Sequence, residues 1–184
     1  MKKKLKIIAF SGSLRKESYT TKLVHAFKAS APSHIEVEFV PIDKLPFINE
    51  DLEDDLPKAV TDLHKKVKSC DAVLFATPEY NRSYSPVLKN AIDWGSRPHG
   101  NNTWDGKPAG VVGCSPYQMG GFGAVNHLRQ VLLYVNTATM QQPEFYLNGA
   151  ADVFDKLGKL TDKETQKHID GFWEAFSKWI EANL

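Results

Sequence analysis

The sequence has little of three features that assign a protein to a class by themselves: cysteine, net charge and long apolar runs. Its 184 residues include two cysteines and carry a formal net charge of +1 at pH 7. A near-neutral chain gives no electrostatic argument for binding nucleic acid or an acidic membrane surface. Charged residues interrupt every apolar run well before membrane-spanning length. We therefore expect neither a nucleic-acid partner nor a membrane segment.

The two cysteines, Cys70 and Cys114, have neither the CxxC spacing of redox motifs nor any metal-ligand spacing. Two isolated thiols without a secretion signal are typical of a reducing compartment. The basic start of the chain and the apolar run Leu5–Phe10 together resemble a signal peptide. However, Lys6 interrupts that run and Ser11 ends it, so we interpret it as a first strand. We expect a cytoplasmic protein without a metal site.

What the sequence does have is an alternation of strand and helix patterns, in a chain with 42% hydrophobic residues. Short apolar runs predict buried strands, and apolar residues three or four positions apart predict helices. The expected strands are Lys6–Phe10, Ile35–Val40, Asp71–Ala76, Pro108–Cys114 and Thr137–Gln142. The expected helices are Thr20–Ala31, Pro57–Ser69, Ser85–Trp94, Ala124–Val135 and a last helix that begins at a Thr161–Glu164 capping box.

Strands separated by helices are joined by crossovers, and they form a mostly parallel sheet with helices on both faces. No repeat, low-complexity tract or linker divides the chain. The pattern predicts an α/β fold, a three-layer sandwich in one domain that spans residues 1–184. We interpret the acidic stretch Glu50–Asp55 as a solvated loop, and Trp94 and Trp104 as packing residues.

Ligands of an open parallel sheet bind beyond the carboxyl ends of the strands, where the strand order reverses. Three turns of unusual composition follow the first, third and fourth expected strands. The first, residues 11–20, places hydroxyls and Arg15 ahead of a helix N terminus. Free amides and a guanidinium both attract an anion, so this turn suits a phosphate. It is neither a P-loop nor a GxGxxG turn, and a plain capped turn explains it equally well.

The second turn, residues 77–84, contains two tyrosines and a proline, which suit a flat aromatic ligand. Taken alone, it is better explained by tyrosines that cover the sheet edge. The third turn, residues 113–121, is rich in glycine, which allows close backbone approach but usually only makes a turn. Together the three turns indicate one ligand with a phosphate at one end and a planar ring at the other. FMN fits that description.

Two motifs resemble a known family. The run TPEYN-x-S at residues 77–83, followed by LKNAIDW at residues 88–94, is similar to the signature of the NADPH-dependent FMN reductases. That family includes flavin-dependent quinone, chromate and azo-dye reductases. The stretch from Gly12 to Ser18 resembles its phosphate loop, and the similarity extends from about Ile7 to Phe145.

The resemblance implies a flavodoxin-like fold, a five-stranded parallel sheet of order 2-1-3-4-5, non-covalent FMN and a homodimer or homotetramer. It also implies an oxidoreductase that passes electrons from NADPH or NADH through FMN to a quinone, flavin, chromate or azo compound. FMN carries this chemistry, so no side chain is assigned a catalytic role. Carried over by position, the cofactor-binding residues are Ser11, Ser13, Arg15, Ser18, Tyr19, Thr20, Pro78, Glu79, Tyr80, Asn81, Ser115 and Tyr117.

The sequence departs from the family pattern at two of these positions, and the proline of Ser85-Pro86 stands one position later than usual. Thr20 stands where the family usually has asparagine, which changes one expected phosphate contact. Tyr117 stands where glycine is frequent, and its ring is expected to narrow the acceptor pocket. We expect Glu79 to act through hydrogen bonds rather than as a proton donor, and Cys114 to be a buried, inert thiol.

Two other classes of function stay open from the residues alone. One is a flavodoxin-type electron carrier without NAD(P)H activity, although such carriers tend to be strongly acidic and this chain is near neutral. The other is a flavin-free α/β binding module. The residues determine neither the acceptor nor a preference between NADPH and NADH.

Overall fold

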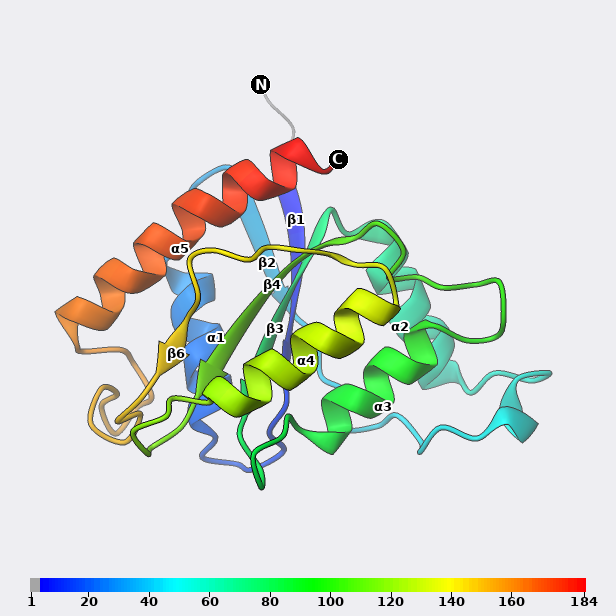
Figure 1. Ribbon diagram of the computed structural model, residues 1–184, viewed down its shortest axis with the longest axis horizontal. Helices are drawn as coiled ribbons and strands as arrows, with labels where there is room; N and C mark the ends of the chain where they lie inside the picture. Colours follow the sequence, from blue (N-terminus) through cyan, green and yellow to red (C-terminus); the bar gives the residue numbers. More distant parts are fainter. Residues whose placement is uncertain (1–3) are drawn as a thin grey trace.

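A parallel sheet forms the centre of the computed structural model, which describes residues 4–184 (Figure 1). Its strands are β1 (Leu5–Ser11), β2 (Ile35–Phe39), β3 (Ala72–Pro78), β4 (Pro108–Cys114), β5 (Ala138–Thr139) and β6 (Tyr146–Leu147). The order is β2-β1-β3-β4-β5, with β6 also paired to β4, and every pair is parallel. The predicted order is confirmed.

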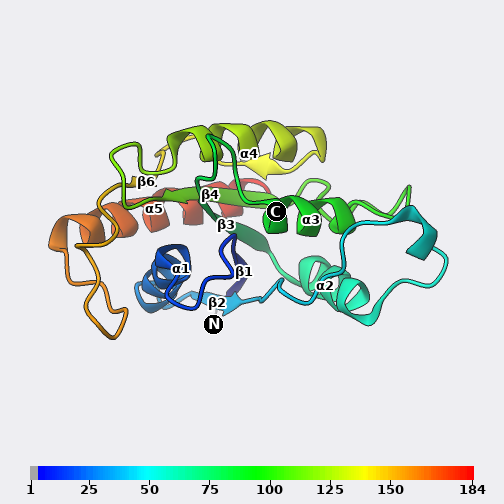
Figure 2. The ribbon, with the colours of Figure 1, turned by 90° about the horizontal axis from the view of Figure 1, so that it is seen from below.

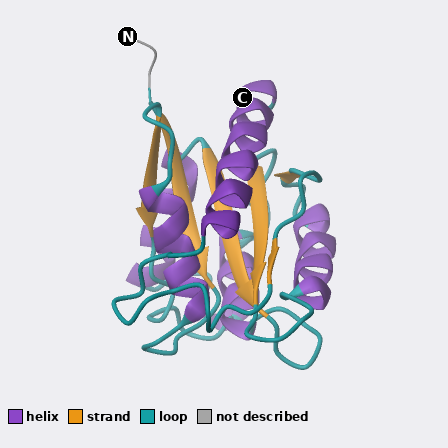
Figure 3. Cartoon of the chain, turned by 90° about the vertical axis from the view of Figure 1, so that its left-hand side faces the viewer, coloured by secondary structure: helices purple, strands orange, loops and turns teal. Residues whose placement is uncertain are grey.

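Helices cover both faces of this sheet, as the three-layer prediction requires (Figures 2 and 3). They are α1 (Tyr19–Ala29), α2 (Lys58–Ser69), α3 (Pro86–Gly95), α4 (Phe122–Tyr134) and α5 (Lys163–Ala182), with a short 3₁₀ turn η1 (Glu50–Leu52). Apolar residues of α1 and α5 pack on one face, and those of α2, α3 and α4 on the other. Within residues 4–184, no helix combines the length and apolar character needed to cross a membrane.

Two hydrophobic cores result from the alternation of side chains along the strands. In β1, Ile7 and Ala9 join the core under α1 and α5, whereas Ile8 and Phe10 join the opposite core. Strands β3 and β4 are buried along their whole length. Apolar runs in the sequence therefore predicted these strands well, because strands covered on both faces need apolar residues at every position.

The last predicted strand, Thr137–Gln142, differs from the structure. Only Ala138–Thr139 of it forms a strand, β5, and a further short strand, β6, follows beyond the predicted end. The two pair with opposite ends of β4. Between them the exposed segment 141–144 leaves the sheet edge, and Pro143 in that segment has no N–H to donate to a ladder. Pairing resumes where Gly113 N donates to Phe145 O at 2.8 Å.

The helix starts follow the expected capping chemistry, with one correction. Ser85 Oγ accepts from the Val87 amide at 3.2 Å at the start of α3, as predicted. For α5, the predicted Thr161 cap is wrong: Asp162 Oδ2 accepts from Thr165 N at 2.7 Å. The Thr161 hydroxyl donates to a loop carbonyl instead. Aspartate is the stronger N-cap residue, so the helix begins one position later.

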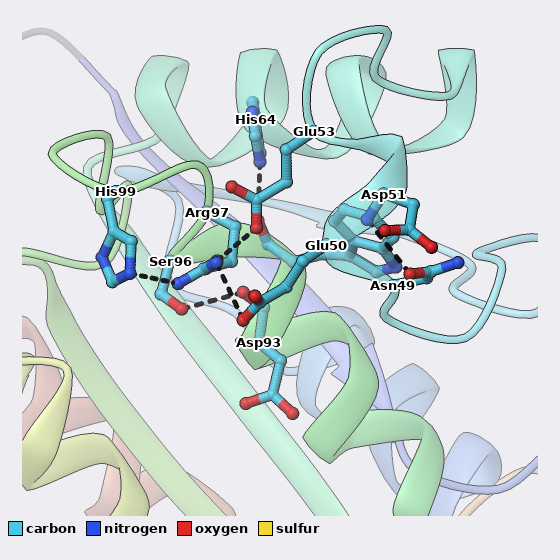
Figure 4. Close-up of polar contacts among 10 residues, drawn as sticks. Asn49, Glu50, Asp51, Glu53, His64, Asp93, Ser96, Arg97 and His99 are labelled. Atoms are coloured by element: carbon cyan, nitrogen blue, oxygen red, sulfur yellow. Dashed lines mark hydrogen bonds and ion pairs between the residues drawn. The ribbon is translucent and has the colours of Figure 1, made fainter.

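The acidic loop before α2 is attached to the end of α3 by Arg97 (Figure 4). Its Nε lies 2.5 Å from Glu53 Oε1, and its Nη2 lies 3.0 Å from Glu50 Oε1. Only 15% of the Glu53 side chain is exposed. The prediction of a solvated loop is therefore wrong at Glu53, because the guanidinium of Arg97, just beyond the end of α3, pairs with it.

Trp94 and Trp104 are both fully buried in the core under α2, α3 and α4, as predicted. The Trp104 ring lies against the last residue of α3, where a Cβ on Gly95 would come within 2.3 Å of the indole. The Gly95 backbone and the Trp104 ring are therefore closer together than any residue with a Cβ at position 95 would allow.

We expect Gly95→Ala to lower the free energy of unfolding by about 1–3 kcal/mol, because the added methyl overpacks a closed core. Chemical denaturation followed by circular dichroism measures this. Gly171→Ala, at an exposed position of α5, is the matched control, since nothing lies within 4 Å of its new Cβ. It should stabilise the protein by about 0.5–1 kcal/mol. Equal effects at both positions would contradict the packing argument.

Candidate functional site

The three turns predicted to hold a ligand meet at the carboxyl edge of the sheet, the lower edge in Figure 1. Strand order reverses between β1 and β3, so the first and second turns flank the switch point. A Cβ on Gly12 would come within 2.9 Å of Pro78 in the second turn, and within 2.8 Å of Ser85 and Leu88 at the start of α3. The first turn therefore lies directly against the second, at a distance that only glycine permits.

The first turn combines free helix amides with a fixed guanidinium. Ser18 is the N-cap residue of α1, and the amides of Tyr19 and Thr20 in its first turn have no hydrogen-bond partner among residues 4–184. Arg15 Nη2 donates to Glu17 O at 2.5 Å, and the guanidinium lies 4.9 Å from the centroid of the Tyr19 ring. Positive charge and amide donors are thus held at one end of the site.

The second turn is a two-residue hairpin. Tyr80 and Ser83 exchange both backbone hydrogen bonds, at 2.9 and 3.0 Å. Asn81 and Arg82 between them have φ values of +50° and +65°, which makes the turn type I′. In the part of the chain that the structure describes, the amides of Asn81 and Arg82 have no acceptor.

The third turn leads from β4 into α4. Ser115 N donates to Leu147 O at 2.9 Å, and Ser115 Oγ accepts from Tyr117 N at 3.2 Å. The amides of Gln118 and Met119 have no acceptor among the described residues. This turn therefore adds a second set of free donors, opposite the hairpin.

Two adjoining pockets of about 300 and 650 Å³ lie between these turns. The smaller is lined by Ser13, Arg15, Ser18, Tyr19, Thr20, Pro78, Glu79, Tyr80, Cys114, Ser115, Pro116 and Tyr117. The larger is lined by Glu79, Asn81, Arg82, Ser115, Pro116, Tyr117, Gln118 and Met119. Because they share Glu79 and Ser115–Tyr117, we refer to both together as the trough. The different linings of its two pockets suit a ligand with two chemically different ends.

Comparison with known proteins gives a consistent result. A family model described as NADPH-dependent FMN reductase matches residues 5–152. The chain belongs to this family. A quinone reductase of Pseudomonas putida is 47% identical over 173 residues, which cover 94% of this chain and 92% of the relative. The predicted class, an NAD(P)H-dependent FMN reductase, is thereby confirmed, and the electron-carrier alternative is not supported.

Solved structures agree with this family membership. The flavoenzyme NAD(P)H:(acceptor) oxidoreductase FerB from Paracoccus denitrificans superimposes with a TM-score of 0.92 and 42% identity, over 97% of this chain and 98% of its own. A flavodoxin variant from Pseudomonas aeruginosa, 16% identical, matches with a TM-score of 0.60 over 94% of this chain and 99% of its own. The second match confirms the flavodoxin-like fold.

The structure brings together all the cofactor-binding residues expected from the family resemblance except Ser11. Ser11 is 4% exposed, and its hydroxyl lies 2.8 Å from that of Thr21, behind the first turn. The sequence prediction did not include five other residues that line the trough: Arg82, Cys114, Pro116, Gln118 and Met119. Four of them stand next to predicted residues in the sequence, so the composition of the turns already pointed to this part of the chain. Gln118 and Met119 belong to the third turn.

Cys114 lines the smaller pocket but is only 2% exposed. Burial raises the pKa of its thiol to about 12, although the hydroxyl of Thr20 lowers it slightly. The thiol therefore stays protonated at neutral pH and lacks the thiolate that nucleophilic chemistry requires. This agrees with the prediction of an inert thiol, and it places Thr20 against the floor of the trough.

Glu79 joins the second turn to the third. Its Oε2 accepts from Ala124 N at 3.2 Å in the first turn of α4, and its Oε1 lies 3.0 Å from Arg82 Nη1. The N-cap residue of α4 is Gly121, which provides no side-chain cap. The Glu79 carboxylate therefore caps the helix from outside, and its negative charge interacts favourably with the positive end of the helix dipole. As predicted, Glu79 acts through hydrogen bonds.

We expect Glu79→Ala to lower the free energy of unfolding by about 1–2 kcal/mol, because α4 loses its cap. Glu79→Gln should cost less, since its amide oxygen can still accept from Ala124. Urea denaturation of the flavin-free protein measures both. Glu174→Ala, which removes an exposed carboxylate from α5, is the control and should change stability little. A similar loss in all three variants would argue against the capping role.

Proposed function

We propose that the trough binds FMN non-covalently, with its phosphate at the first turn and its isoalloxazine ring along the second and third turns. The observation that carries this proposal is the cluster at the small end of the trough: Arg15 beside the free amides of Tyr19 and Thr20. A phosphate is the common ligand of such a helix N terminus with a guanidinium. Hydroxyls of Ser13 and Ser18 line the same pocket.

The rest of the trough fits a planar heteroaromatic ring. Backbone amides without partners come from both sides, Asn81 and Arg82 on the hairpin and Gln118 and Met119 opposite. Amides of this kind donate to ring carbonyls and nitrogens, whose positions a fixed backbone can match. The Tyr80 ring at the edge is 46% exposed and supplies flat apolar surface.

Bound FMN supplies the redox chemistry, accepting a hydride from NAD(P)H and passing electrons to the second substrate. The chain supplies binding and charge stabilisation. Free amides of the second and third turns stabilise negative charge on a ligand in the trough, as an oxyanion hole does. No side-chain acid or base is needed, and Glu79 is already engaged in capping α4.

We further propose a quinone as the acceptor. The Pseudomonas putida relative is named a quinone reductase, and the chain resembles it over nearly all of both sequences. Tyr117 lines both pockets and is 79% exposed, so its ring stands at the rim, where a flat acceptor enters. A ring at this position limits the height of the entrance and favours planar acceptors over bulky ones.

The remaining expectations form part of the same proposal. We infer a single domain over residues 1–184 that works in the cytoplasm as a homodimer or homotetramer. Both cores lie on one sheet, and both cysteines are free and buried, as suits a reducing compartment.

The purified protein should be yellow, and NADPH or NADH should bleach its visible flavin absorbance without oxygen. A quinone added afterwards should restore the colour, because the electrons leave the flavin for the acceptor. Stopped-flow absorbance measures both half-reactions. A colourless protein that takes up no FMN would overturn the cofactor, and a yellow protein that neither nicotinamide bleaches would overturn the reductase.

Arg15→Ala should weaken FMN binding about 10- to 100-fold, because a charge-assisted contact to the phosphate is worth about 1.5–3 kcal/mol. Fluorescence titration of the flavin-free protein measures the dissociation constant. Lys16→Ala removes an adjacent, exposed charge that does not line the trough, so its effect should be small. If both variants bind like the wild type, the phosphate lies elsewhere.

A further inference from the structure

Arg82 has a backbone conformation that arginine rarely adopts. Its φ is +65°, in the left-handed region, and it stands at the second central position of the type I′ hairpin. Glycine is preferred there because an L side chain clashes with its own backbone. Strained residues of this kind concentrate at functional sites, where the side chain has a use that offsets the strain.

The hairpin cannot relieve this strain by moving away, because α4 holds it from several directions. Glu79 accepts from Ala124 N at 3.2 Å, and Ser83 Oγ lies 3.1 Å from His127 Nδ1. The Arg82 carbonyl itself would lie 3.1 Å from a Cβ on Gly123. The turn is thus closely packed at its base, while 74% of the Arg82 side chain is exposed at its tip.

Charges in the trough are arranged at its two ends. Arg15 lines only the smaller pocket, Arg82 lines only the larger one, and Glu79 lines both. No other charged side chain lines the trough. FMN has a single phosphate, and Arg15 with the α1 amides accounts for it. Arg82 therefore provides a second, separate place for an anion.

Arg82 has donors to spare for such an anion. A guanidinium carries five N–H groups in a planar fork, and the structure shows a bond from Nη1 alone, to Glu79 Oε1. That bond fixes the orientation of the head group, as a supporting contact does for a binding residue. The remaining donors of this 74% exposed side chain have no partner among residues 4–184.

We infer that Arg82 binds a phosphate group of the nicotinamide dinucleotide and so sets the affinity of the protein for its electron donor. The inference rests on the proposed function, in which this dinucleotide must place its ring next to the flavin. Two phosphate sources share this chemistry: the pyrophosphate, common to NADH and NADPH, and the 2′-phosphate of NADPH alone. Arg82 is here a specificity and binding residue rather than a catalytic one.

The test compares Arg82→Gln, which removes the charge, with Arg82→Lys, which keeps it. The matched control is Lys178→Gln, which removes a cation from an exposed ion pair on α5. Calorimetry on the FMN-loaded proteins measures the dissociation constants of NADP⁺ and NAD⁺, independently of turnover. Steady-state kinetics then give KM for NADPH and NADH.

Arg82→Gln should weaken NADP⁺ binding about tenfold, with partial recovery in Arg82→Lys and no change in Lys178→Gln. Weaker binding of NADP⁺ alone assigns the contact to the 2′-phosphate, and equal weakening of NAD⁺ assigns it to the pyrophosphate. Unchanged binding of both nucleotides overturns the inference. The proposed function fails separately, if neither NADPH nor NADH reduces the flavin of the wild-type protein.

Arg82→Gly tests the strain on which the inference depends. Glycine and glutamine both remove the guanidinium, but only glycine adopts a φ of +65° freely. Arg82→Gly should therefore melt about 2–4 °C higher than Arg82→Gln, while binding NADP⁺ equally weakly. Equal melting temperatures would show that the conformation costs nothing and remove the first step of the argument.

Discussion

The carboxylate of Glu79 joins α4, whose N-cap residue provides no side-chain cap, to the hairpin of the second turn. It follows β3 directly, whereas its bond to Ala124 reaches 45 residues further along the chain. Because Gly12 has no side chain, the first turn also packs closely against the second, and the three turns form one connected surface. The amides that line the trough keep their directions only because these contacts fix the backbone around them.

Much of this fold could be predicted from the sequence. Strands β1, β3 and β4 are buried on both faces, and unbroken apolar runs are the expected signal for such strands. The family motifs then identified twelve cofactor-binding residues, all of which except Ser11 line the trough. The boundary errors are local: Asp162 replaces Thr161 as a cap, and the last predicted strand is shorter, with β6 following it separately.

What the sequence did not predict depends on contacts across the fold. The bond between Glu79 and α4 exists only once the third turn has folded back beside the second. Asn-Gly is the usual signal for a type I′ hairpin, and Asn81-Arg82 lacks the glycine. The sequence therefore did not predict the two positive φ values. The ion pair between Arg97 and Glu53 could not be predicted either, because nothing in the sequence near one residue identifies the other as its partner.

The separation of β5 from β6 has a consequence for how copies of this protein can meet. At that edge β5 and β6 contain two residues each and are separated by an exposed proline-containing segment, so no continuous row of backbone groups is open to a further strand. At the other edge, β2 is five residues long and carries Glu36 and Glu38, the second of them paired with Lys66. Both margins of the sheet thus discourage growth by strand addition. Contacts between copies are left to helices and loops, and a crowded solution of folded protein is protected from edge-to-edge aggregation.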